Sequence, residues 1–208
     1  MANANRPSGY TPVGYLSGAA WNGQARVYSI AAAYNTALYI GDPCISSGTS
    51  DAFGVQGIAL GAETAALRGV IVGLFDSGSA TAVRGAPTAG IVSNLVYRPA
   101  SHANVWYALV ADDPQIIFQV QEESNGTALA AADVGLNQIG ATGTGNGFVS
   151  GWQISSATGA TPNTTNTLQL RLLGLAQIPD NTFGAYAKWL VQINVHELGH
   201  GVGATGVA

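Results

Sequence analysis

The sequence feature that most constrains the fold is the run from Asn104 to Glu123, NVWYALVADDPQIIFQVQEE, whose side chains sort onto two faces with a period of two. That period is the repeat of a β-strand, whereas an amphipathic helix repeats about every 3.6 residues. The middle of the run, Asp112-Asp113-Pro114, has the residue types of a turn, because proline fixes φ and aspartate side chains bond nearby backbone groups. The run therefore predicts two strands joined by a turn.

Short apolar or alternating runs recur along the rest of the chain, and residues typical of turns separate them. Strands are predicted at 26–30, 37–40, 55–60, 69–75, 91–97, 148–155, 168–172 and 187–195, with loops at 48–54, 76–90 and 140–151. The segment 127–133 could form a helical turn but is too short for a stable free helix. The sequence predicts an all-β fold, a jelly-roll-like sandwich or barrel of about eight to ten short strands with long Gly/Thr/Asn-rich loops.

Three segments are expected along the chain. Residues 1–24 form an extended N-terminal arm, because Pro7 and Pro12 fix φ and bias the residues before them toward extended geometry. Residues 25–195 form the β-rich domain, and residues 196–208 form a Gly-rich, solvent-exposed C-terminal tail. An arm of this kind can lie across its own sheet or across a neighbouring molecule, and an ordinary ordered N-terminal segment is the alternative.

The charge of the chain narrows the choice of partners. Charged residues make up only 9% of the sequence, against about 25% in an ordinary globular domain. Such a surface suits a protein that lives assembled, although a solubilising coat of small polar residues is an equal alternative. The net charge is −4 and the seven basic residues are scattered, so nucleic acid is not an expected partner. No run approaches the roughly 18 apolar residues of a membrane span.

One motif resembles an enzyme site. The stretch His196-Glu197-Leu198-Gly199-His200 matches H-E-x-x-H, which on a helix places two imidazoles on one face to bind zinc, with the glutamate as general base. The pattern that would supply a third histidine places it at position 206, which is Gly206. The alternation before His196 indicates a strand, on which the two histidines would lie about 13 Å apart. We therefore expect a chance match in an exposed tail, with no bound metal and no other cofactor.

Other possible sites are weaker still. The carboxylate pairs Asp112-Asp113 and Glu122-Glu123 belong to turn or strand positions, where neighbouring side chains diverge. The single cysteine, Cys44, has no base nearby in the sequence and is expected to be a buried, inert thiol. The sequence therefore offers no catalytic residue.

The chain as a whole is similar to the head decoration proteins of tailed bacteriophages, also called capsid cement proteins. The resemblance covers most of the chain, including the opening residues 1–24. The segments that carry it follow one another in order: 41–43 (GDP), 69–73 (GVIVG), 97–101 (YRPAS), 110–114 (VADDP), 118–122 (FQVQE), 128–135 (ALAAADVG), 170–175 (LRLLGL) and 179–194 (PDNTFGAYAKWLVQIN). Each segment alone is a weak signal, and their order and spacing are the specific part. In such proteins the chain ends soon after an Ile-Asn pair, so HELGH lies in an extension beyond Ile193-Asn194.

The resemblance implies a non-enzymatic role on the outer surface of the assembled capsid. The expected partners are the major capsid protein and the chain itself, as a homodimer or homotrimer, with no nucleic acid and no membrane. Because the N-terminus has no apolar signal run, synthesis in the cytoplasm of the bacterial host is expected. Arg6, Pro7, Tyr10 and Tyr15 of the arm are the predicted contact residues, so that deleting residues 1–16 should weaken binding without unfolding the β core. The alternatives are a small zinc metalloendopeptidase and a phage tail or fibre module.

Overall fold

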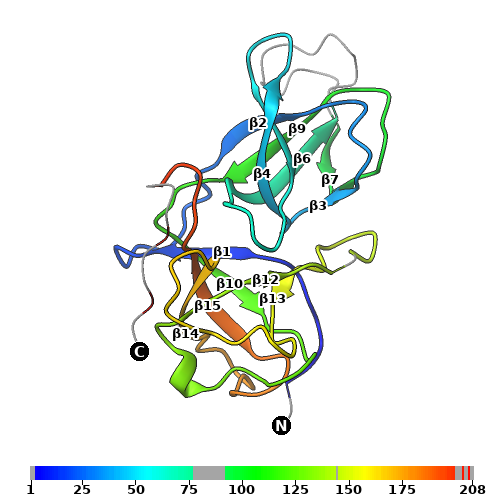
Figure 1. The fold of residues 1–208 in the computed structure, drawn as a ribbon. Helices are drawn as coiled ribbons and strands as arrows, with labels where there is room; N and C mark the ends of the chain where they lie inside the picture. The colour runs from blue at the N-terminus through cyan, green and yellow to red at the C-terminus, as the bar shows by residue number, and fades with distance from the viewer. Residues whose placement is uncertain (1–2, 77–91, 144, 200–202, 204–205, 207–208) are drawn as a thin grey trace.

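A computed structural model describes residues 3–76, 92–143, 145–199, 203 and 206. Its elements are short β-strands and, within these ranges, a single 3-10 turn, η1 (Ala131–Asp133), so the all-β prediction is confirmed. The strands form two main sheets, one above the other in Figure 1. Two small pairs accompany them, β12 (Gly140–Ala141) with β13 (Gln153–Ile154) and β3 (Leu38–Tyr39) with β8 (Tyr97–Arg98).

The upper sheet is a closed structure. Its order is β4 (Pro43–Ser50), β5 (Gln56–Leu60), β2 (Arg26–Ile30), β9 (Trp106–Ala111), β6 (Gly69–Asp76) and β7 (Val92–Leu95). Strand β4 also pairs with β6 at Pro43–Val70, which closes five of the strands into a ring that we call the barrel. Its interior is filled by apolar side chains such as Ile30, Ile58 and Trp106. Closure reduces the free edges that an open sheet would expose, and β7 extends the sheet outside the ring from β6.

The lower sheet, hereafter the five-stranded sheet, has the order β1 (Thr11–Tyr15), β10 (Ile116–Gln121), β15 (Lys188–Ile193), β14 (Leu170–Leu175) and β11 (Asn137–Gln138). Inward residues alternate along its strands as a period of two requires; Phe118 and Val120 of β10 and Trp189 of β15 are all buried. The same core cluster takes in Leu67 and Val70 of the barrel side, so the two sheets share a packed junction.

The strand–turn–strand run at 104–123 forms this junction. Both strands exist, but β9 belongs to the barrel and β10 to the five-stranded sheet, so they do not pair with each other. Asp112, at the turn between them, is 5% exposed. Its carboxylate accepts a hydrogen bond from the Tyr28 hydroxyl at 2.5 Å and lies 3.4 Å from an Arg26 nitrogen. These contacts fix the point at which the chain passes from one sheet to the other.

Several predicted boundaries differ from the structure. Residues 48–50, expected in a turn, continue β4, because the β4–β5 ladder extends to the Ser50–Gln56 pair after a bulge. The strand expected at 148–155 is reduced to Gln153–Ile154. The arm lies along its own sheet, where β1 pairs with β10. Most of the loop expected at 76–90 lies outside the described residues, as does His200.

Candidate functional site

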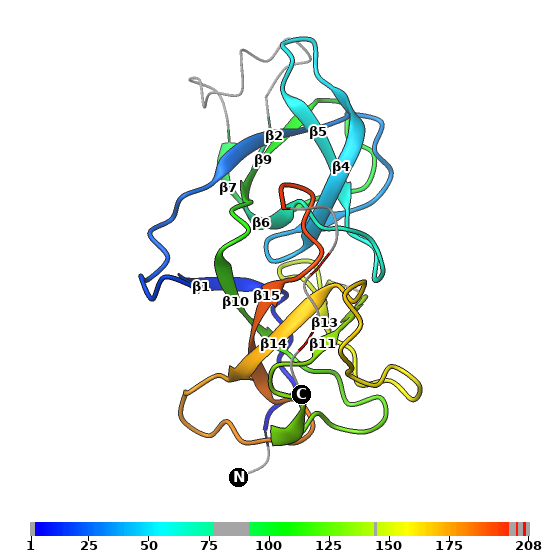
Figure 2. The same ribbon diagram turned by 60° about the vertical axis from the view of Figure 1, so that its left-hand side comes forward.

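The first two residues of the enzyme-like motif are built into the fold. Val195 and Glu197 exchange backbone hydrogen bonds with Leu67 on the barrel side, each at 2.9 Å. His196 between them is 4% exposed, which corrects the expectation that the motif lies in a solvent-exposed tail. Figure 2 shows this red segment rising from β15 to lie beside the barrel. The backbone hydrogen bonds to Leu67 hold this segment against the barrel, and this explains why His196 is buried.

The Glu197 carboxylate is fully engaged by groups from the barrel. One oxygen accepts a hydrogen bond from the Ser46 backbone nitrogen at 2.8 Å, and the other accepts one from the Ser46 hydroxyl and lies 3.2 Å from Nε of Arg68. The Arg68 side chain is only 9% exposed. We call Ser46, Arg68, His196 and Glu197 the clasp. A carboxylate bound on both oxygens is poorly placed to act as a general base.

The His196 ring is likewise held in place. Its Nδ1 accepts a hydrogen bond from the Leu198 nitrogen at 3.0 Å. Burial lowers the pKa of His196 to about 4, so the ring is neutral at physiological pH. In the part of the chain that the structure describes, no group of three or more His, Cys, Asp or Glu side chains could hold a metal ion.

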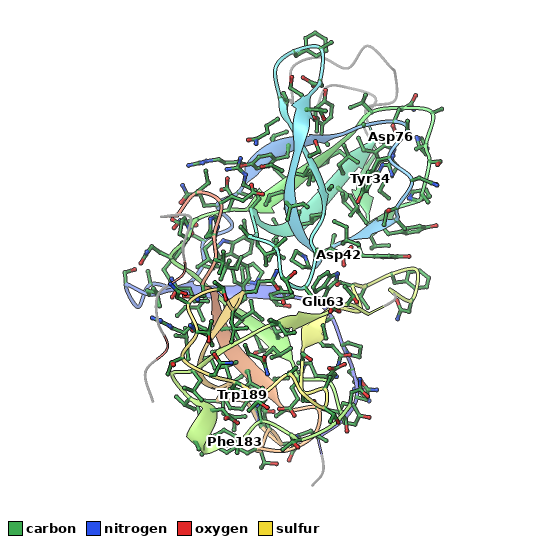
Figure 3. The ribbon with its side chains drawn as sticks, viewed as in Figure 1. Tyr34, Asp42, Glu63, Asp76, Phe183 and Trp189 are labelled. Carbon is green, nitrogen blue, oxygen red and sulfur yellow. The ribbon has the colours of Figure 1, made fainter. Side chains whose placement is uncertain are left out.

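The remaining buried acids and the cysteine do not converge on a site. Glu122 is fully buried and accepts hydrogen bonds from Leu129 N and Trp189 Nε1, both at 3.1 Å, and burial raises its pKa to about 7. Asp42 is 3% exposed, and burial raises its pKa to about 6. Cys44 is buried, as expected, and burial raises its pKa. In Figure 3 Asp42 lies near the junction of the two sheets, whereas Trp189, the partner of Glu122, lies far below it.

The four arm residues predicted to contact a partner fall into different environments. Arg6 is exposed, and its backbone nitrogen donates to Gln121 Oε1 at 2.8 Å. Pro7 is half-buried, as is Tyr15, whose hydroxyl donates to Asn22 Oδ1 at 3.2 Å. Tyr10 is only 1% exposed. The structure therefore leaves Arg6 most available to a partner.

Tyr10 belongs to the core, which corrects its assignment as a surface contact. Its ring packs edge-on against Phe118, with centroids 6.3 Å apart, and tilts against Trp152 at 6.4 Å. Its backbone nitrogen donates to Gly41 O at 2.9 Å. Deleting residues 1–16 would remove both this side chain and β1. Such a truncation would destabilise the five-stranded sheet and cannot report on binding alone.

Arg6 and Pro7 lie beside the loop predicted at 140–151, whose exposed apolar tip the sequence analysis did not predict. With Asn5 they line a groove of about 370 Å³ whose other wall is formed by Asn146, Val149, Ser150 and Gly151. Phe148, next to Val149, has 67% of its surface exposed, the largest fraction among the exposed large hydrophobic residues described. The sequence pointed to residues 148–155 as a strand, and only the isolated Phe148-Val149 pair in a Gly-rich stretch hinted at an exposed apolar tip.

Comparisons of the chain with protein-family profiles, with characterised proteins and with solved structures gave no match. The resemblance to head decoration proteins therefore stays a prediction that rests on the segments named above. Within the described ranges, no helix has the length and apolar character needed to cross a membrane.

Proposed function

We propose that this chain is a decoration protein that binds the outer surface of a mature bacteriophage head and bridges subunits of the major capsid protein. The observation that carries the proposal is the division of the N-terminal arm. Tyr10 anchors the arm in the core, while Arg6, four residues earlier, stays exposed beside a groove. An arm fixed at one end presents its outer residues without a large ordering cost on binding.

Two further features support this function. The surface is sparsely charged, since charged residues make up 9% of the chain, and little electrostatic repulsion opposes close packing on a lattice. Glu197, the general base of the peptidase alternative, is tied into the clasp. A protein that binds only the mature lattice stabilises that state by linkage, and many copies add their modest contributions. A homodimer or homotrimer would match the symmetry axes of such a lattice.

The test is reconstitution on purified heads that lack the chain. Decoration predicts saturable binding with a copy number approaching that of the major capsid protein on a quantitative gel, and heads that resist heat better once decorated. A few copies per particle would favour a tail or fibre module. Absence from particles, together with one zinc per chain by elemental analysis, would favour the peptidase.

A further inference from the structure

The loop that carries Phe148 packs beside an aromatic pair, Tyr39 and Tyr97. Gly145 lies so close to the Tyr39 ring that an added Cβ would come within 2.6 Å of it. Tyr39 in turn stacks on Tyr97, with ring centroids 5.5 Å apart. Figure 1 shows the loop, in yellow-green, projecting beside β3. We call Tyr39, Val96, Tyr97, Phe148 and Val149 the aromatic surface. Arg6 and Pro7 adjoin it, because they line one groove with Val149.

Hydrogen bonds brace the described residues of the loop at its tip and at its base. At its tip, the Asn146 side-chain oxygen accepts hydrogen bonds from the backbone nitrogens of Phe148 and Val149, at 3.0 and 3.1 Å. At its base, Thr142 donates from both its backbone nitrogen and its hydroxyl to one oxygen of Glu63. Gly147 adopts φ +89°, which favours glycine. Preorganisation of this kind lowers the entropy lost on binding.

The charges on this surface indicate what kind of partner fits it. Arg6 is the one charged residue among those that line the groove, and the ion pairs found among the described residues do not include it. A guanidinium at the edge of an apolar surface pairs best with a carboxylate. The complementary surface is therefore an apolar pocket for the Phe148 ring with an acidic side chain at its rim.

A second copy of the chain does not meet that requirement. A two-fold interface brings the same patch together on both subunits, so Arg6 would approach the Arg6 of its partner across this groove. Asp180 lines a separate groove with Arg6, on the side away from Val149 and Ser150, and there Lys188 accompanies it. Glu63 lies at the base of the loop, and its carboxylate already accepts two hydrogen bonds from Thr142. A different protein is the better match.

We propose that the aromatic surface is the face that docks on the capsid shell, with Phe148 inserted into an apolar pocket of the major capsid protein and Arg6 paired with a carboxylate at its rim. This inference rests on the proposed function, which supplies the partner. Exposed aromatic and arginine side chains are the residue types that dominate binding energy at protein interfaces.

The experiment measures binding of full-length variants to purified heads that lack the chain. Phe148→Ser should weaken binding about 100-fold, whereas Phe53→Ser should have little effect, because Phe53 is 48% exposed at the β4–β5 turn, away from this surface. Arg6→Glu should weaken binding at least about tenfold, and Arg6→Lys less, because lysine keeps the charge but not the fork of donors.

The outcomes separate this inference from the function that it rests on. If wild-type protein fails to bind heads, the proposed function fails and takes the inference with it. If wild-type binds and Phe148→Ser binds equally well, the function stands and the inference alone is overturned. If Phe148→Ser instead abolishes self-association in sedimentation experiments while head binding is unchanged, the surface joins copies of this chain, which also overturns the inference.

Discussion

The two sides of the junction between the barrel and the five-stranded sheet are built differently. On one side the clasp joins them through the ion pair of the mostly buried Arg68 with the half-buried Glu197. On the other side the loop at 142–150 leans on Tyr39 and leaves Phe148 and Val149 in solvent. Figure 1 shows the two segments, red and yellow-green, on opposite sides of the molecule. Glu197 of the enzyme-like motif is therefore bonded into the junction, whereas the loop leaves its apolar side chains open to the partner that we propose.

The largest expected effect is a loss of stability on replacing Tyr10, the buried aromatic residue on the side of the loop, in contrast to the exposed Phe148. Tyr10 lies 1% exposed against Phe118 and Trp152. Replacing it with alanine should lower the free energy of unfolding by about 3 to 4 kcal/mol, because a cavity replaces a packed ring. Urea denaturation measures the change. A loss below about 1 kcal/mol would mean that the arm is not part of the core.

The next effect tests the clasp. Glu197→Ala should cost about 2 to 3 kcal/mol of stability, because it leaves Arg68 without its ion-pair partner at a mostly buried site. Asp180→Asn is the matched control, since Asp180 is exposed and asparagine tolerates its φ of 60°. An unchanged midpoint in urea, together with loss of a peptidase activity present in the wild type, would assign Glu197 to catalysis instead.

A pH titration tests the fully buried glutamate, Glu122, whose surroundings differ from those of the half-buried Glu197. Glu197 has a cation beside it, whereas Glu122 has only hydrogen-bond donors, and burial raises the pKa of Glu122 to about 7. Between about pH 4.5 and 7 the folded state therefore holds a proton that the unfolded state has lost, so stability falls as the pH rises through this window. The effect is absent below pH 4.5 and complete above pH 7.

The difference between wild type and Glu122→Gln isolates this contribution. His196 acts in the opposite direction at acid pH, because its lowered pKa makes stability rise with pH between about 4 and 6.5, and Asp42 acts in the same direction as Glu122. Chemical denaturation across pH 4 to 8 should show a difference on the order of 1 kcal/mol that grows with pH. A difference independent of pH would show that Glu122 titrates normally.

The smallest effect concerns stability at the aromatic surface. Phe148→Ser should change the free energy of unfolding by less than about 0.5 kcal/mol, because the side chain is mostly exposed and makes few contacts to lose. Thermal denaturation beside the wild type measures it. A large loss would mean that Phe148 supports the loop, and the binding comparison would then need Phe148→Leu in its place.

Most of the strands could be predicted from the sequence, because period-two alternation is a local property. The strand 26–30 and the core of 187–195 are found where the pattern indicated. The pairing of strands is not local. Nothing between Asn104 and Glu123 shows that Val110 and Ile116 face different sheets, because each half alternates equally well in a hairpin or across a junction.

Only part of the candidate site could be predicted from the sequence, because the burial and contacts of its residues depend on segments that are distant along the chain. Arg6 stood out because it is a charge in a Pro-rich arm, but the burial of Tyr10 depends on Phe118 and Trp152, which are more than a hundred residues away. The role of Glu197 depends on Ser46 and Arg68 in the same way. Motif spacing records neighbours along the chain, whereas these roles are set by neighbours in space.

The most direct measurement is a cryo-electron microscopy reconstruction of heads decorated with this chain. We expect density for it on the outer surface of the shell, at boundaries between major capsid protein subunits, with the aromatic surface turned toward the shell and the clasp turned away. Undecorated heads, or density in which Phe148 and Arg6 face solvent, would contradict this account.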